Sequence, residues 1–389
     1  MPISGIAGTS ALITDIDRRK ALPIIRSLGK KGVRVIGISY NKLPMGWFSK
    51  YCAKTYLCPD YRQHPEQFLD ALESICSQEK PDVFYPIEDV VLSLCVAHPE
   101  RWRPYTRALL PGPDELECAY DKWKTIQVAQ RCGVPVPNSY CPETIEDVVH
   151  LAQEKSKQWV IKPRKSSGSR GVRYVEDPAE LVTEYQNISQ KYPRPIVQER
   201  IASGGSAVGV FFLLGPDRNP LAIFSHRRIR EYPVTGGPST LCESFRDDAL
   251  IAQSIKLIRE MGCVGVSMVE YKFDSGTNQY VLMEVNPRFW GSLQLAIFAG
   301  VDFPLLYHVT VLGMKVIPVL EYPLGVYSRW LWPGDILHFL TNPERYHLQP
   351  SFFRFRYPKL TYDILSTDDP WPMLGIVIEG ARKLFNRER

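Results

Sequence analysis

Three polar side chains alternate with apolar ones in the segment YVLMEVNPRFWGS, residues 280–292. Glu284, Asn286 and Arg288 stand at every second position, and side chains two apart on an extended chain share one face. Pro287 cannot donate a ladder hydrogen bond, so it favours the end of strand pairing here. The pattern predicts a strand that brings a carboxylate, an amide and a guanidinium to one place.

The turn sequence DSGTN, residues 274–278, separates this strand from VGVSMVEYKF, residues 264–273. We therefore predict a hairpin that closes near residues 276–277 and sets Glu270 nearly opposite Glu284. Opposed like charges destabilise a sheet by roughly 0.2–1 kcal/mol, and by more in a dry cleft. A solvated acidic face is one interpretation of this pattern, and a cation held between the two carboxylates is the other.

A divalent cation would remove this repulsion. Mg²⁺ favours hard oxygen ligands, typically one or two carboxylates with phosphate oxygens and water; Mn²⁺ could take its place. Asn286 would add a neutral oxygen on the same face, and Arg288 a cation suited to phosphate or carboxylate. The predicted metal ligands are Glu270, Glu284 and Asn286.

The loop KPRKSSGSRGV, residues 162–172, follows a predicted strand and is rich in small residues. Such residues let backbone N–H groups wrap phosphate oxygens, and Lys162 can add a point charge. The loop lacks the GxxxxGK[ST] pattern of a Walker A loop. A Gly/Ser hairpin turn would look much the same, so the loop alone leaves both interpretations open. Together with the hairpin it predicts a magnesium-nucleotide site.

The composition excludes several classes of protein. A chain of 389 residues favours two or three domains, and 44% hydrophobic with 23% charged residues is typical of globular proteins. The net charge of +5 is spread along the chain and does not indicate nucleic-acid binding. Nine cysteines without a CxxC pair favour reduced thiols. Neither a signal peptide nor an apolar run of about 18 residues is found. We expect a cytoplasmic protein without a membrane span.

The order of expected elements changes along the chain. Residues 10–110 alternate strand-like segments such as SALITD, VRVIGIS and DVFYPI with helix-like ones, which predicts βαβ units and a parallel sheet. No GxGxxG follows the first strand, so a nicotinamide cofactor has little support. From about residue 114, strands and helices mix in α+β fashion. Beyond about residue 320, proline and aromatic residues dominate; this part is either a packed extension or a contact with a partner or membrane surface.

The stretches DKW, WVIKP, SSGSRGV, VQERI, VEYKFD and LMEVNPRFWGS resemble the ATP-grasp superfamily, in particular its carboxylate–amine ligases and carbamoyl-phosphate synthase-like members. The fold implied is α/β and α+β. A Rossmann-like parallel-sheet domain at 1–115 would precede an ATP-grasp module of two α+β subdomains at 116–312. Its nucleotide lid would span about 135–200, and a C-terminal extension would follow at 313–389.

The resemblance also implies roles for individual residues. Lys122 and Lys162 look like the two basic residues that hold ATP phosphates. The hinge that receives adenine would fall at Gln198 to Ile201. Many members carry an acidic ribose contact after this hinge, whereas this chain reads ASGGSAVG, which leaves Glu199 as a substitute. The remaining implied roles are the flexible phosphate loop (Ser167, Gly168, Ser169, Gly171), the magnesium ligands (Glu270, Glu284, Asn286) and the arginine facing the transferred phosphoryl group (Arg288).

The segment SHRRIREYPVTGG, residues 225–237, carries more charge than core packing requires. On a regular strand Arg228 and Arg230 share one face. We expect one of them to anchor a substrate carboxylate or developing phosphate charge. A solvated basic strand is the alternative.

The predicted activity is an ATP-dependent ligase that activates a carboxylate as an acyl phosphate and joins it to an amine or similar nucleophile. ATP and Mg²⁺ would be required, with a small-molecule carboxylate and amine as substrates. Assembly into a homo-oligomer is left open. Two alternatives remain. One is an ATP-binding sensor without turnover, against which the complete set of Glu270, Glu284, Asn286 and Arg288 weighs. The other is a kinase-like phosphotransferase, which fold-level analogy does not exclude.

Overall fold

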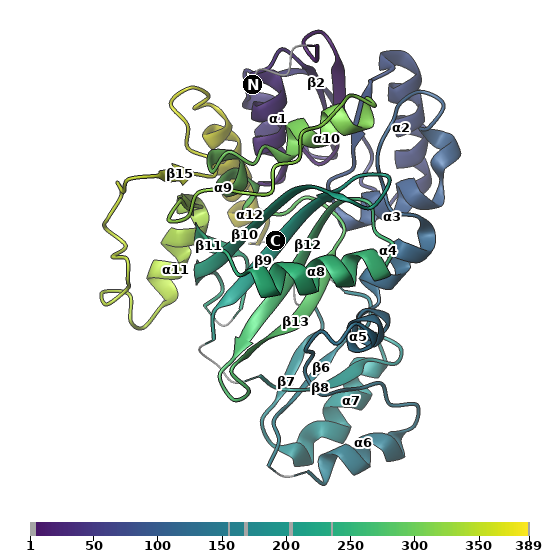
Figure 1. The fold of residues 1–389 in the computed structure, drawn as a ribbon, viewed down its shortest axis with the longest axis vertical. Helices are drawn as coiled ribbons and strands as arrows, with labels where there is room; N and C mark the ends of the chain where they lie inside the picture. Colours follow the sequence, from purple (N-terminus) through teal and green to yellow (C-terminus); the bar gives the residue numbers. More distant parts are fainter. Residues whose placement is uncertain (1–4, 155, 167–169, 202–204, 235, 388–389) are drawn as a thin grey trace.

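The computed structural model describes residues 5–154, 156–166, 170–201, 205–234 and 236–387. These residues form three sheets (Figure 1). One is a four-stranded parallel sheet near the N-terminus, and the other two are mainly antiparallel. The predicted α/β and α+β fold class is confirmed.

The N-terminal sheet has the strand order β3-β2-β1-β4, with every pair parallel. Since β2 and β4 lie on opposite sides of β1, the carboxyl ends of β1 and β4 form the type of crevice where open α/β sheets bind ligands. Its elements are β1 (Ser10–Ile13), α1 (Ala21–Gly29), β2 (Arg34–Ser39), the 3-10 turn Met45–Phe48, β3 (Cys52–Leu57), α2 (Pro65–Glu79), β4 (Val83–Tyr85), α3 (Asp89–Ala97) and the 3-10 turn Pro99–Arg101.

Two short helices connect this unit to a small antiparallel sheet with the order β5-β8-β6-β7. Trp159 and Val197 of this sheet pack against Leu181 and Tyr185 of a covering helix, which gives it a core of its own. It lies at the lower end of the molecule in Figure 1. The elements are α4 (Pro113–Tyr120), α5 (Lys122–Arg131), β5 (Ser139–Tyr140), α6 (Ile145–Ala152), β6 (Trp159–Lys162), β7 (Arg173–Val175), the 3-10 turn Pro178–Glu180, α7 (Leu181–Ser189) and β8 (Ile196–Glu199).

The central sheet has seven strands in the order β13-β12-β9-β10-β11-β14-β15. Alternation along β9 sends Val210 and Phe212 to a core shared with α8, while Phe211 and Leu213 face a core shared with α1, α9 and α10. The sheet is therefore covered on both faces (Figure 1). Its elements up to residue 311 are β9 (Ala207–Leu214), β10 (Pro220–Glu231), β11 (Ser239–Ser244), α8 (Asp248–Glu260), β12 (Gly265–Asp274), β13 (Gln279–Asn286), α9 (Leu293–Phe298) and α10 (Phe303–Val311).

The C-terminal residues complete the central sheet and also contact the N-terminal unit. β14 pairs with β11, and β15 pairs with β14 in parallel. The buried Asp369 accepts hydrogen bonds from Arg26 Nε (2.9 Å) and Ser49 Oγ (2.7 Å). The predicted boundary at residue 312 therefore falls within one continuous packing unit. The elements are β14 (Tyr327–Arg329), the π-helical turn Leu331–Asp335, α11 (Ile336–Thr341), β15 (Leu360–Tyr362) and α12 (Pro372–Arg387).

Within the described residues, every helix is too short or too polar to cross a membrane.

Candidate nucleotide and metal site

The hairpin β12–β13 brings two carboxylates together. Glu270 pairs with Glu284, as its turn sequence predicts, and Met268 pairs with Asn286. The Asn286 side chain donates from Nδ2 to Glu284 Oε1 at 2.8 Å. The donor set on this strand pair is therefore two carboxylates and an amide, with the amide held against one of them.

The electrostatics of this pair favour a cation. Burial raises the pKa of Glu270, Arg228 opposes that shift and Glu284 adds to it, and the pKa lies above its ordinary value as a result. Among the described residues no cluster of three acidic, histidine or cysteine side chains forms a complete protein metal site. Mg²⁺ suits a smaller set because it usually keeps phosphate and water ligands. The residues present therefore fit a nucleotide-bound Mg²⁺.

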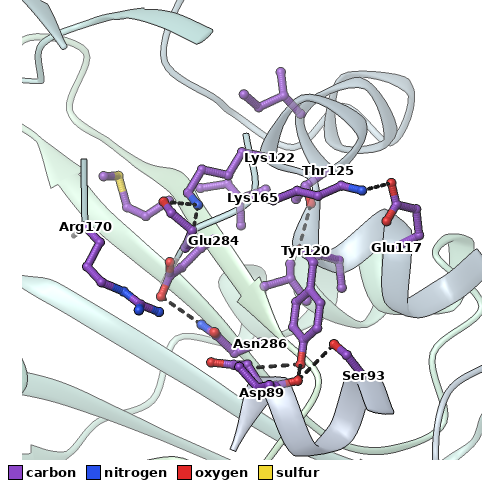
Figure 2. Close-up of a pocket in the computed structure, with 17 residues that line it drawn as sticks. Asp89, Ser93, Glu117, Tyr120, Lys122, Thr125, Lys165, Arg170, Glu284 and Asn286 are labelled. Atoms are coloured by element: carbon purple, nitrogen blue, oxygen red, sulfur yellow. Dashed lines mark hydrogen bonds and ion pairs between the residues drawn. The ribbon is translucent and has the colours of Figure 1, made fainter. Parts of the chain in front are cut away.

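A cavity of about 360 Å³ opens beside Glu284 and Asn286. Its walls come from three parts of the molecule: α3 of the N-terminal unit, the α4–α5 connection, and β13 with the base of the 163–171 loop. Figure 2 shows Asp89, Tyr120, Lys122, Arg170 and Glu284 around this space. The carboxylate end of the hairpin thus borders a space large enough for part of a nucleotide and a small substrate.

Two lysines lie beside Glu284. Lys122 begins α5, whose N-cap Asp121 accepts hydrogen bonds from the backbone N–H groups of Trp123 and Lys124. Burial lowers the pKa of Lys122, although the charge of Glu284 partly opposes this. Lys162 ends β6, and its burial, together with the charge of Lys122, lowers its pKa to about 8 although Glu284 opposes the shift. Both predicted phosphate lysines therefore face the same carboxylate.

The base of the predicted phosphate loop is anchored to α5. Lys122 Nζ donates to the backbone oxygen of Ser166 at 2.6 Å. Arg164 makes a bidentate pair with Asp121, with Nε to Oδ1 at 3.0 Å and a closer Nη2 to Oδ2 contact. Gly171 has φ +74°, where a side chain would be strained and would meet Tyr192. The predicted loop residues Ser167, Gly168 and Ser169 lie outside the described residues.

Arg288 reaches across to the N-terminal unit. It donates from Nε to Asp89 Oδ1 in a close contact, and from Nη2 to Asn286 Oδ1 at 3.1 Å. Burial lowers and Asp89 raises the pKa of the guanidinium, and the net shift is upward. Arg288 is thus held as a cation between the hairpin and α3.

The prediction that Arg228 and Arg230 share one face of a strand is wrong. Arg228 pairs with Cys242 and Arg230 with Leu241, because a bulge at Ile229 shifts the register of β10 against β11. Arg228 donates to Glu270 Oε1 at 3.0 Å and so borders the predicted metal site. Arg230 instead donates from Nε and Nη2 to the buried Asp335, at 2.8 Å each. Arg230 is therefore part of a buried ion pair and is not a catalytic candidate.

The predicted hinge residues stand apart from the cavity. Gln198 is buried and donates from Nε2 to Ser139 Oγ at 2.8 Å, and Glu199 accepts from Asn138 Nδ2 at 2.8 Å. Ile201 follows the end of β8 and is half-buried. The cavity is lined by other residues, so adenine and ribose recognition at Gln198, Glu199 and Ile201 remains a prediction.

Sequence reasoning missed several residues at this site. Asp89 and Tyr120 line the cavity, and Asp121 anchors Arg164. Asp121 could have been found, since an aspartate just before an amphipathic segment is a typical N-cap. Asp89 gives no such signal, because its partner Arg288 lies 199 positions away.

Parts of this chain are similar in sequence or in fold to known proteins. Residues 119–292 match the family model of the ATP-grasp domain. The carbamoyl phosphate synthase large chain of Thermomicrobium roseum is 25% identical over 286 residues, which cover 70% of this chain and 26% of that protein. The chain thus spans about a quarter of this curated relative.

Two solved structures share the fold. The biotin carboxylase domain of the Hydrogenobacter thermophilus 2-oxoglutarate carboxylase, in complex with MgADP and bicarbonate, has a TM-score of 0.67 at 16% identity, covering 82% of this chain and 73% of that one. The N5-carboxyaminoimidazole synthetase of Staphylococcus aureus has a TM-score of 0.64 at 15% identity, covering 82% and 81%. The family match assigns an ATP-grasp domain to residues 119–292, and the two solved structures show that the chain shares their fold.

Proposed function

We propose that this chain is an ATP-dependent ligase that joins a carboxylate to an amine or similar nucleophile. The opposed pair Glu270 and Glu284 carries the proposal: Glu284 lines the cavity together with Lys122 and also faces Lys162, and Glu270 is paired with Arg228. Plain nucleotide binding does not require this concentration of charge. The ATP-grasp domain supports ATP as the phosphoryl donor.

The chemistry proceeds in two balanced steps. A carboxylate oxygen of the substrate attacks the γ-phosphorus of ATP, the bond to the β-phosphate oxygen breaks, and ADP leaves with that bonding pair. The acyl phosphate that results is then attacked at its carbonyl carbon by the amine. Inorganic phosphate leaves and the amine nitrogen loses a proton. Such a reaction depends mainly on positioning and on charge stabilisation.

The residues divide this work between them. Glu270, Glu284 and Asn286 would hold Mg²⁺, which when bound neutralises charge on the phosphate oxygens. Lys122 and Lys162, which both face Glu284, bind the same phosphates. Arg288 stabilises the transferred phosphoryl group. Arg228, which already lies against Glu270, holds the substrate carboxylate on the far side of the metal site.

The proposal is tested by incubating the purified protein with Mg·ATP and pools of carboxylic acids, with and without amines, and measuring ADP and free phosphate. A ligase releases both in equal amounts and only when the correct substrates are present. Added hydroxylamine should trap the acyl phosphate as a hydroxamate. ADP without free phosphate would instead indicate a phosphotransferase. Tight ATP binding without turnover on any pool would overturn the ligase in favour of a sensor.

A further inference from the structure

A chain of hydrogen bonds runs from the N-terminal unit into the predicted metal site. Asp89, the first residue of α3, accepts from Arg288 Nε. Arg288 donates from Nη2 to Asn286 Oδ1 at 3.1 Å, and Asn286 donates from Nδ2 to Glu284 Oε1 at 2.8 Å. Asp89 lies outside residues 119–292, so its contribution comes from beyond the ATP-grasp domain.

The outer end of this chain is fixed in place. The Tyr120 hydroxyl donates to Asp89 Oδ1 at 3.2 Å and lies 3.3 Å from the Asp89 backbone oxygen (Figure 2). The side chains of Arg288 and Asp89 are only 16% and 20% exposed. Burial raises the pKa of Asp89, but Arg288, Lys20 and Tyr120 outweigh it, so the pKa lies below its ordinary value and the group stays anionic.

These contacts decide where the guanidinium points. Arg288 also donates from Nη1 to the backbone oxygen of Phe289 at 3.2 Å, so three of its five N–H groups take part in these bonds. The other two N–H groups belong to the two Nη atoms, one on each. A guanidinium held by its remaining bonds can use such groups to bind a phosphoryl or carboxylate group.

We propose that Asp89 is a positioning residue for phosphoryl transfer. From the N-terminal unit it fixes the orientation of Arg288, and through Arg288 that of Asn286 at the predicted metal site. This inference rests on the proposed ligase function. It makes the docking of α3 against the hairpin a condition for turnover.

The test compares Asp89→Asn with the wild-type protein, using ADP release on the substrates identified above. The amide keeps the size of the side chain but loses the charge that holds Arg288. We expect kcat to fall about 10- to 100-fold, as for a reacting group displaced by about 1 Å. KM for ATP and the affinity for Mg·ATP should stay within twofold. Tyr120→Phe should lower kcat only a few-fold, since the carboxylate remains.

Asp70→Asn is the matched control. Asp70 also pairs with an arginine of the N-terminal unit, Arg101, and its side chain is 70% exposed, away from the cavity. The same chemical change there should leave kcat and KM unaltered. Circular dichroism and urea unfolding of each variant identify any loss of kcat that arises from unfolding.

The possible results distinguish a failure of the positioning role of Asp89 from a failure of the ligase proposal. If Asp89→Asn keeps kcat within twofold of an active wild type, the positioning role is wrong and the ligase proposal stands. If kcat is unchanged but KM for the acid or amine rises, Asp89 contacts substrate directly and the positioning role is again wrong. If the wild-type protein turns over none of the substrates, the ligase proposal fails and the role of Asp89 fails with it.

Discussion

Two arginines on β10 illustrate how similar sequence signals acquire different roles. Arg228 pairs with Glu270 at a partly exposed position, with side chains 14% and 19% exposed. Arg230 pairs with Asp335 in the interior, with side chains 2% and 0% exposed. The bulge at Ile229 separates them onto opposite faces. The accessible pair can exchange partners with a metal or substrate, whereas the buried pair has no such freedom.

The buried pair belongs to a larger polar network. Asp335 also accepts from Arg329 Nε at 2.6 Å and from Thr240 Oγ1 at 2.9 Å, and Arg230 donates from Nη1 to the backbone oxygen of Pro350 at 2.7 Å. These contacts join β10, β11 and β14 to the turn before α11. A buried charge is stable only when its partners are complete, so this network holds the C-terminal residues onto the sheet.

The largest expected effect is on stability, from Asp335→Ala. The change leaves two buried guanidinium groups without their carboxylate, and breaking one side of a buried ion pair costs about 3–5 kcal/mol. Urea unfolding should therefore show a loss of that size. An unfolding free energy within 1 kcal/mol of wild type would show that the buried network does not hold the fold.

Glu284→Gln should lower activity strongly and stability little, unlike Asp335→Ala. The amide keeps the shape of the side chain but cannot supply the negative charge that Mg²⁺ requires, so turnover should fall at least 100-fold, which is about 2.7 kcal/mol. Stability should change by less than about 1 kcal/mol, because the variant also removes the repulsion from Glu270. Turnover within threefold of wild type would remove Glu284 from the metal site.

Alanine substitutions of Arg228 and Arg230 test whether the two arginines of β10 have different roles. We expect Arg228→Ala to lower turnover about tenfold with a modest loss of stability, since Mg²⁺ can balance Glu270 in its place. Arg230→Ala should destabilise by about 3 kcal/mol or more, with kcat little changed in the fraction that remains folded. Measurements of kcat and of the free energy of unfolding for both variants test these expectations. Equal effects of the two variants on kcat would contradict the separation of roles.

The smallest expected effect is a pH dependence that distinguishes the site lysine from the permanently charged arginines. The pKa of Lys162 is about 8, and in the proposed function its protonated form binds the triphosphate. Raising the pH from 7.5 to 9.5 should therefore weaken Mg·ATP binding several-fold, because the free lysine loses its charge. Calorimetric titration measures this change.

Lys162→Arg is the control for this titration, because guanidinium stays protonated across the range. Lys122 and Glu284 face the same group, and both remain in the control. A pH dependence that is equally steep in Lys162→Arg would assign the titration to another residue.

Part of the site was predictable because its geometry is local. The five-residue turn predicts that Glu270 and Glu284 lie nearly opposite each other, and a bulge at Met283, which the turn does not predict, brings them into direct register. The parallel N-terminal sheet follows from the alternation of strand and helix patterns. The separation of Arg228 from Arg230 was not predictable, since a bulge depends on how β10 is held between β9 and β11.

The sequence by itself determined which chemical groups this protein brings to its hairpin and which basic side chains could bind a phosphate. Turns and period-two alternation act over a few residues, so they can be recognised in the sequence. Only the tertiary structure decided that Arg288 meets Asp89 and that Arg230 meets Asp335, pairs separated by 199 and 105 positions. Those partners are selected by the burial of apolar faces when whole sheets and helices pack together. No local pattern encodes that choice, since it depends on the summed contacts of distant segments.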